Sequence, residues 1–203
     1  LVRSRGLGDV YKRQAERRAD WWLFGGIYRP VYLTAKPRTQ IEHIAVDARA
    51  DGTLHTDVYL KNISKGQQLE LSLISCDSQL PIGRQVCGLS TEEKQILTTH
   101  WNNIRTWDPE HPNLYRLTMR LLSTTGDVVH EITERIGFRT IEFRPEDGVY
   151  LNGTRLLVKG INRHCFDPET GRTISRELSL KDALLIKQMN MNAVRSHYPP
   201  DTH

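Results

Sequence analysis

The sequence predicts a mainly β protein that ends in an α/β unit, and two observations support this fold class. From residue 36 to about residue 138, short segments in which apolar and polar residues alternate follow one another, with turns between them. From about residue 156 to residue 198, two apolar segments of strand length flank a segment of helical character. We therefore expect a β-sandwich followed by a β-α-β unit.

The first region has the pattern of an immunoglobulin-like sandwich, in which short antiparallel strands are joined by turns. Asp51-Gly52 and Gly126-Asp127 supply turn residues between two pairs of strands. Because alternate residues of a strand share one face, the apolar residues of each segment are expected to face the same side. These residues are Ile44, Val46, Ala48, Leu54, Val58, Leu60, Leu69, Leu71, Leu73, Leu117, Met119 and Leu121.

The C-terminal region predicts a strand, a helix and a second strand. The apolar run within residues 156–161 forms the first strand, and the second begins at Ala193. Between them we expect a helix from about Leu180 to Asn190, with Ser179 as its N-cap and Asp182 as the capping-box partner. A β-α-β unit of this length places its two strands parallel and next to each other.

Polar residues gather where these two strands end. Asn162, Arg163 and His164 come at the end of the first strand, and Arg195 and His197 come at the end of the second. Parallel neighbouring strands end at the same edge of a sheet, and in a β/α barrel that edge contains the active site. The sequence therefore predicts a site formed by arginine and histidine side chains at this edge.

The charge of the chain does not indicate a nucleic-acid partner. The net charge is +4, but residues 1–14 hold four basic residues against one aspartate, which leaves +1 for the rest. That tail is expected to be a disordered, adaptor-like segment outside the fold. No apolar run approaches the roughly 20 residues that cross a bilayer. We expect a soluble protein without a nucleic-acid or membrane partner, and both the bacterial-type cytoplasm and the periplasm remain open.

The cysteines do not define a compartment or a metal site. Cys76, Cys87 and Cys165 are an odd number without metal-ligand spacing. A disulfide between Cys76 and Cys87 and free thiols both remain open, and free thiols are favoured. Several C-terminal side chains are potential ligands, but their spacing matches no structural zinc pattern, so no metal is expected in this chain. They are His164, Cys165, His197, Asp201 and His203.

A short connection joins the two predicted regions. Residues 148–151 and 155–158 are expected to form a hairpin that turns at Asn152-Gly153. Ile141 and Phe143 share a face and are expected to belong to the core.

Trp107 lies in a loop and has two interpretations, stacking on a sugar ring and packing at a domain junction, of which packing is favoured.

Four stretches resemble glycoside hydrolase family 2, which contains β-galactosidases, β-glucuronidases and β-mannosidases. They are GIYRPVYL within residues 21–35, WDPEHPNLY at 107–115, NGTRLLVKGINRH at 152–164 and DALLIKQMNMNAVRSHYP at 182–199. The resemblance covers residues 15–203. It implies that residues 15–35 end a jelly-roll sugar-binding domain, that residues 36–138 form the sandwich, and that residues 139–203 begin a catalytic TIM barrel.

The resemblance implies a fragment of a retaining glycoside hydrolase that acts on terminal β-galactosides. In the family both catalytic carboxylates are glutamates on later barrel strands, and the acid/base follows an asparagine. This sequence has no Asn-Glu pair, so the fragment is expected to lack both glutamates and to be inactive alone. β-Glucuronidase and β-mannosidase are alternative specificities, and a non-catalytic carbohydrate-binding or scaffold module is the alternative from another class.

The resemblance also assigns roles to the polar residues of the predicted edge. It implies that His164 and His197 line the sugar subsite and stabilise the transition state, with Arg195, Arg163 and Asn162 in support. The commonest family form has one more residue between the arginine and the Ser-His of the second strand. No cofactor is expected in this chain, although Mg²⁺ or Na⁺ binds in some family members. The full-length protein is expected to bind a β-linked galactoside or a related glycan and to form a homo-oligomer.

Overall fold

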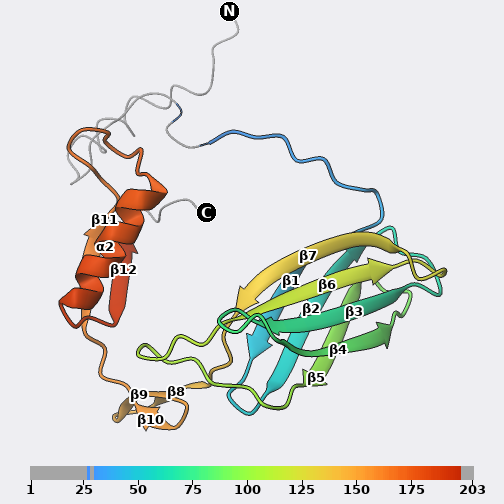
Figure 1. The fold of residues 1–203 in the computed structure, drawn as a ribbon, viewed down its shortest axis with the longest axis horizontal. Coiled ribbons are helices and arrows are strands. Elements are labelled where there is room, and N and C mark those ends of the chain that lie inside the picture. Colours follow the sequence, from blue (N-terminus) through green and yellow to red (C-terminus); the bar gives the residue numbers. More distant parts are fainter. Residues whose placement is uncertain (1–26, 28–29, 198–203) are drawn as a thin grey trace, which may run out of the picture. The chain divides into compact units, whose positions relative to one another are not determined.

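The computed structural model describes residue 27 and residues 30–197. The described residues divide into two compact units, one of residues 34–157 and one that contains residues 158–197 together with residues 27 and 30–33. Figure 1 shows the strands of the first unit and the β-α-β segment of the second.

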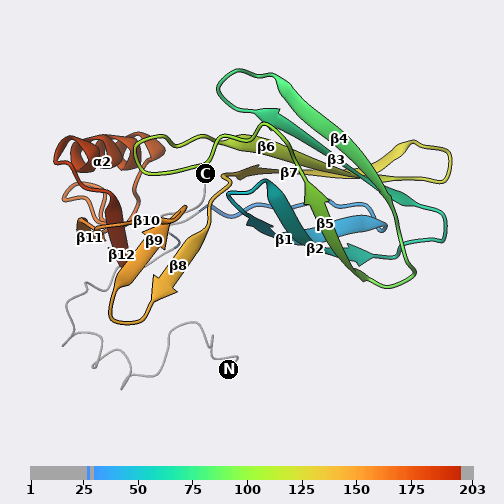
Figure 2. The same cartoon turned by 90° about the horizontal axis from the view of Figure 1, so that it is seen from below.

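Residues 40–136 form two antiparallel sheets that face each other as the layers of a sandwich (Figure 2). The three-stranded sheet has the order β1-β2-β5, and the four-stranded sheet has the order β4-β3-β6-β7. The strands are β1 (Gln40–Ala48), β2 (Thr53–Lys61), β3 (Gln68–Ser75), β4 (Pro81–Gly88), β5 (Lys94–His100), β6 (Tyr115–Leu122) and β7 (Val128–Ile136). The predicted immunoglobulin-like sandwich is confirmed.

The core of the sandwich consists of the inward side chains of both sheets. Apart from a few half-buried residues of β1, the predicted alternating apolar residues are buried there, in the order that the period of two requires. Phe138, which follows β7, is completely buried and meets the ring of Tyr115 edge-on at a centroid distance of 5.4 Å. The turn residues Gly52 and Gly126 have φ of 87° and 90°, which explains why glycine occupies both hairpins.

A small three-stranded sheet follows the sandwich within the same unit. It consists of β8 (Ile141–Arg144), β9 (Gly148–Leu151) and β10 (Thr154–Arg155), in the order β10-β9-β8. The turn between β9 and β10 lies at Asn152-Gly153 as expected, and both residues have positive φ, 51° and 79°. The prediction for the second strand of this hairpin was wrong, because pairing ends at Arg155 instead of continuing to residue 158.

The prediction that Ile141 and Phe143 belong to the core was also wrong. Their side chains are 48% and 80% exposed. Both residues do lie on one face of β8, as the alternation requires. The described residues provide no second layer over that face, so a shared apolar face here does not produce a core.

The second unit contains a strand, a helix and a strand: β11 (Gly160–His164), α2 (Arg176–Gln188) and β12 (Ala193–His197). The two strands pair in parallel, which confirms the predicted β-α-β arrangement. The first strand starts later than expected, since Leu157 and Val158 precede it and are exposed. Gly160 belongs to the strand, where a Cβ would lie 3.2 Å from the backbone oxygen of Ala193. This close approach explains why glycine occupies this position.

The helix begins one turn earlier than the sequence suggested. Its N-cap is Ser175 instead of Ser179, and the Oγ of Ser175 accepts a hydrogen bond of 3.1 Å from the backbone N–H of Leu178. Ser175 has the extended backbone that a cap requires, with φ −76° and ψ 159°. The helix also ends earlier, at Gln188, and Asn190 has a left-handed φ of 58°.

Two further expectations concern the N-terminal segment and the cysteines. Most of the strand expected at residues 21–35 lies outside the described residues, and residues 27 and 30–35, which are described, do not belong to a strand. Cys76, Cys87 and Cys165 are free, so the 76–87 disulfide does not form. In the part of the chain that the structure describes, no helix is long and apolar enough to cross a membrane.

Candidate functional site

The candidate site lies at the carboxyl edge of the parallel strands β11 and β12. Their register pairs Asn162 with Arg195 and His164 with His197. Opposite residues of a β ladder lie on the same face of the sheet. Positions 162, 164, 195 and 197 therefore share one face, and 164 and 197 lie together at its carboxyl end.

The two faces of β11 differ in burial. Asn162 and His164 are exposed on one face, whereas Ile161 and Arg163 are half-buried on the other. That second face lies against α2, whose buried residue is Ile186. The strand therefore turns Arg163 toward the helix and away from its two polar neighbours.

Arg163 forms an ion pair with a carboxylate of α2. Its side chain is 14% exposed, and its Nε and Nη2 donate hydrogen bonds of 2.8 and 2.5 Å to Oδ2 of Asp182. Its Nη1 donates to the Sγ of Cys165 at 3.1 Å. The same Sγ lies 3.9 Å from the Oγ of Ser196 on β12. One guanidinium thus joins the helix to the first strand and to the residue that follows it.

The loop after β11 is ordered by its own carboxylate. Asp167 accepts hydrogen bonds from the backbone N–H groups of Glu169 at 2.9 Å and Thr170 at 3.0 Å. These hydrogen bonds, first that of Thr170 and then that of Glu169, lower the pKa of Asp167 below its usual value. Asp167 also pairs with Gly171 through two backbone hydrogen bonds of 2.8 Å. The carboxylate therefore stabilises the conformation of the loop through hydrogen bonds to the loop's own backbone.

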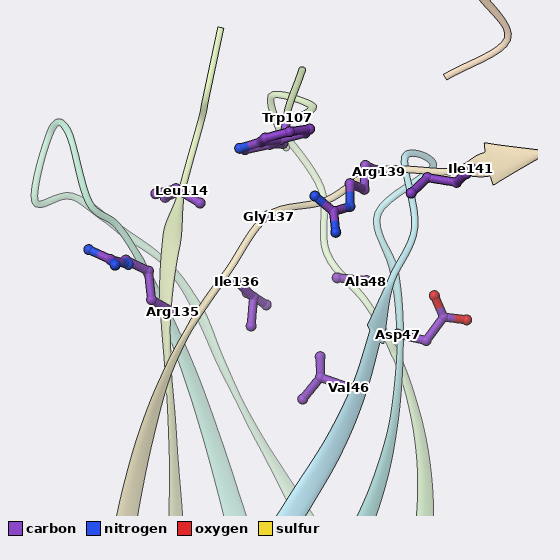
Figure 3. A pocket seen from close by; sticks show the side chains of 10 residues that line it. All are labelled: Val46, Asp47, Ala48, Trp107, Leu114, Arg135, Ile136, Gly137, Arg139 and Ile141. Atoms are coloured by element: carbon purple, nitrogen blue, oxygen red, sulfur yellow. The ribbon is translucent and has the colours of Figure 1, made fainter. Parts of the chain in front are cut away.

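A cavity lies in the first unit, at one end of the sandwich. It has a volume of about 530 Å³, and Figure 3 shows the side chains that line it. Val46, Ala48 and Ile136 supply apolar surface, and Arg139 lies close to Trp107. The remaining lining residues are Asp47, Leu114, Arg135, Gly137 and Ile141. This cavity contains none of the residues predicted for the site.

Trp107 is packed against its own unit. The guanidinium of Arg139 lies 4.7 Å from the centroid of the indole ring. A Cβ at Gly137 would meet the Cβ, Cγ and Cδ1 atoms of Trp107 at 3.0–3.1 Å. One ring face is thus covered by a cation, and the backbone at Gly137 lies against the base of the side chain. These contacts favour the packing interpretation of Trp107 over sugar stacking.

Metal-ligating side chains do not gather in the described part of the chain. Within residue 27 and residues 30–197, no group of three His, Cys, Asp or Glu side chains could hold a metal ion. A Mg²⁺ or Na⁺ ion, as some family members bind, would therefore find no cluster of three such side chains among these residues.

The structure separates residues that the sequence grouped together. Asn162, His164 and Arg195 share the open face of the two strands, but Arg163 belongs to the opposite face. The alternation of side chains along a strand already predicts that Arg163 faces away from Asn162 and His164. The partner of Arg163 could not be found in this way, because Asp182 matched the position of a capping residue in the expected helix. The earlier helix start places Asp182 well inside α2, where it meets the strand.

Sequence profiles of one family match most of the chain. The profile described as "Glycosyl hydrolases family 2" matches residues 39–139. The profile described as "Glycosyl hydrolases family 2, TIM barrel domain" matches residues 143–203. The first match corresponds to the sandwich, and the second contains the β-α-β unit.

Curated relatives have two activities in their names. The beta-galactosidase BgaC of Bifidobacterium adolescentis is 36% identical over 193 residues, which cover 89% of this chain and 18% of that protein. A putative beta-glucuronidase of Formosa agariphila is 32% identical over 191 residues, which cover 91% of this chain and 23% of that protein. The chain spans about a fifth of the length of these relatives.

Solved structures show the same fold. The apo structure of beta-glucuronidase 3 from Bacteroides uniformis has a TM-score of 0.74 and 25% identity, and the match covers 91% of this chain and 23% of that one. The beta-glucuronidase of Parabacteroides merdae with glycerol in its active site has a TM-score of 0.73 at 23% identity, a likeness of fold alone.

These matches, together with a sandwich followed by a β-α-β unit, place the chain among the glycoside hydrolases. It belongs to glycoside hydrolase family 2.

Proposed function

We propose that this chain is part of a retaining glycoside hydrolase that removes terminal β-galactose residues from glycans. The observation that supports the site best is the parallel register of β11 and β12, which pairs His164 with His197 at the carboxyl edge. The relatives named as beta-galactosidases support the substrate.

The reaction needs two carboxyl groups about 5 Å apart on either side of the glycosidic bond. We assign both to glutamates outside this chain. Carboxylates near the site have other partners: Asp182 pairs with Arg163, and the carboxylate of Asp167 accepts the N–H groups of its loop. The chain of 203 residues is therefore expected to be inactive by itself.

The strand edge would form part of the wall of the sugar subsite. His164 and His197 would donate hydrogen bonds to sugar hydroxyls, and these bonds would strengthen as positive charge develops on the ring in the transition state. An imidazole suits this role because one nitrogen can donate while the other fixes the orientation of the ring. Arg195 would hold the catalytic carboxylates in position, since a guanidinium offers a rigid fork of donors. Asn162 would support this group from the same face.

The longer enzyme would contain three domains that this chain covers in part. We assign residues 15–35 to the end of a jelly-roll sugar-binding domain, residues 36–138 to the sandwich and residues 139–203 to the start of the TIM barrel, and residues 1–14 to none of them. The family profiles over 39–139 and 143–203 support a change of domain close to residue 140. Many enzymes of this family are oligomers, and a homo-oligomer is proposed for the longer protein.

The experiment begins with the open reading frame to which this sequence belongs. The extended protein is assayed on nitrophenyl β-galactoside, β-glucuronide and β-mannoside, beside His164→Ala, His197→Ala and the control His55→Ala. His55 lies on β2 of the sandwich, where it hydrogen-bonds Thr98. We expect cleavage of the galactoside, a loss of roughly 100-fold or more in kcat for each site variant, and no loss for the control.

Other results would change the conclusion in defined ways. Preference for the glucuronide or the mannoside would replace the proposed substrate but keep the hydrolase. A protein that cleaves none of the three and still binds sugar would overturn the hydrolase and favour a non-catalytic carbohydrate-binding or scaffold module.

A further inference from the structure

We infer that Arg163 and Asp182 act as a positioning pair for His164, an inference that rests on the proposed role of the strand edge in sugar binding. Neither residue lies on the open face of the strands. Arg163 faces α2, and its side chain is 14% exposed, whereas that of Asp182 is 34% exposed. Arg163 and Asp182 would therefore affect a substrate only through His164, which lies on the open face.

The geometry of the pair restricts the guanidinium in two directions. Nε and Nη2 both donate to one oxygen, Oδ2 of Asp182, at 2.8 and 2.5 Å. Nη1 donates to the Sγ of Cys165 at 3.1 Å. A planar guanidinium held through three nitrogens has little freedom to rotate. The side chain of Arg163 is thus fixed between the helix and the chain beyond its own strand.

This arrangement fixes the residues on both sides of His164. Arg163 precedes it and Cys165 follows it, and the same guanidinium joins the two on the helix side. Since successive residues of a strand point to opposite faces, fixing residues 163 and 165 toward α2 directs His164 to the other face. The Sγ of Cys165 also lies 3.9 Å from the Oγ of Ser196, which precedes His197 on β12. The contacts therefore reach the second strand as well.

The pair is distinct from an ordinary surface ion pair. Exposed pairs such as Arg49–Asp47, with side chains 53% and 55% exposed, hold two flexible side chains in water and contribute little. Arg163 is largely withdrawn from water and has its carboxylate on a different secondary-structure element. Its loss would leave the carboxyl end of β11 without its tie to the helix, although the backbone ladder to β12 would remain.

The first part of the test uses this chain itself. NMR would follow the Nε–H resonance of Arg163 and the side-chain order of the His164 ring in the wild type, Arg163→Lys, Arg163→Gln and Asp182→Asn. We expect a slowly exchanging Nε–H in the wild type, its loss in Asp182→Asn, and a more mobile His164 ring in Asp182→Asn and Arg163→Gln, while the backbone shifts of β12 stay in place. Arg176→Gln, at the exposed start of α2, is the control. It should change neither the exchange of the Arg163 Nε–H nor the order of the His164 ring.

The second part measures turnover in the extended enzyme with the same variants. A misplaced group costs roughly 10-fold to 100-fold in rate, so we expect kcat to fall by that factor in Asp182→Asn and Arg163→Gln, with KM changed less than kcat. Arg163→Lys should lose less kcat than Arg163→Gln. The double variant with Arg163→Gln and Asp182→Asn should lose no more kcat than the single variant with the larger loss.

The outcomes separate this inference from the proposed function. A rapidly exchanging Nε–H in the wild-type chain, or an ordered His164 ring in all variants, overturns the positioning pair whatever the enzyme does. An extended enzyme without glycosidase activity overturns the proposed function, and the ring order then still decides whether the pair positions His164. Normal kcat in both Asp182→Asn and Arg163→Gln, in an active enzyme, also refutes the pair.

Discussion

The carboxylate of Glu70 offers a direct test of what stabilises the four-stranded sheet. Its side chain is 6% exposed, although it lies on the face of β3 that points away from the core. It accepts hydrogen bonds from Arg84 on β4 and from Arg120 on β6, the latter at 3.3 Å from Nη1. Arg120 in turn donates to Glu131 on β7 at 2.5 Å. Charges of alternating sign thus cross all four strands.

We expect Glu70→Gln to lower the free energy of unfolding by about 1–2 kcal/mol. A hydrogen bond to a charged group contributes about 1.5–3 kcal/mol and a neutral one about 0.5–1.5 kcal/mol, so removing the charge costs about 1 kcal/mol for each bond. Arg84 and Arg120 are 65% and 39% exposed and regain water when the charge is lost, which keeps the total below that of a fully buried pair.

Urea unfolding followed by circular dichroism measures this change as a lower midpoint at an unchanged slope. Glu42→Gln is the matched control, because Glu42 pairs with Lys61 on the exposed surface of β1 and β2 and should have a smaller effect. A midpoint for Glu70→Gln equal to that of the control would refute the argument. It would mean that the free-energy cost of burying the carboxylate equals the stabilisation from its two arginine partners.

Three further predictions concern other parts of the fold. Desolvation, and then the charge of Lys36, lower the pKa of His130, whose Nδ1 accepts the N–H of Ile41 at 3.2 Å. The neutral imidazole therefore contributes stability that is present above about pH 6.5 and decreases as the pH falls. Between pH 8 and pH 5, the urea midpoint should fall more for the wild type than for His130→Gln. Gly137→Ala should cost about 1–3 kcal/mol, because its Cβ would lie 3.0 Å from that of Trp107, and an unchanged tryptophan emission and midpoint would contradict this. Ser175→Ala should cost about 1 kcal/mol of helix stability, visible as faster amide exchange in the first turn of α2, whereas Ser179→Ala should not cost a cap.

The strands of the sandwich could be predicted because their burial follows one rule. Leu69, Leu71 and Leu73 of β3 are completely buried, and the residues between them lie on the other face, so the period of two alone defines the core. The same rule placed Ile141 and Phe143 on one face of β8 but could not tell whether another layer covers that face. Periodicity gives the orientation of a side chain, whereas burial also depends on a second element that the pattern does not contain.

The start of the helix shows a different limit. Ser175 and Ser179 are one turn apart, and either could cap a helix that runs toward Gln188. The backbone decides between them, since Ser175 is extended and Ser179 is helical. Ser179 Oγ is buried without a hydrogen-bond partner among the described atoms, a cost that a capping role would have avoided. The sequence gives no means to weigh these two conformations.

The connection between sandwich and barrel is itself part of the sandwich unit. Thr140 and Asn152 bond reciprocally, with the Thr140 N–H donating to Oδ1 of Asn152 at 2.9 Å and the Asn152 N–H donating to the oxygen of Thr140 at 2.8 Å. The Nδ2 of Asn152 also donates to the backbone oxygen of Trp107 at 3.1 Å, and the N–H of Arg139 donates to the oxygen of Ala48 at 2.9 Å. The bonds of Asn152 tie the hairpin turn to residues 107 and 140, and the bond of Arg139 ties the connection to the end of β1. Residues 139–157 therefore belong to the same compact unit as the sandwich, although the match to the barrel profile already begins at residue 143.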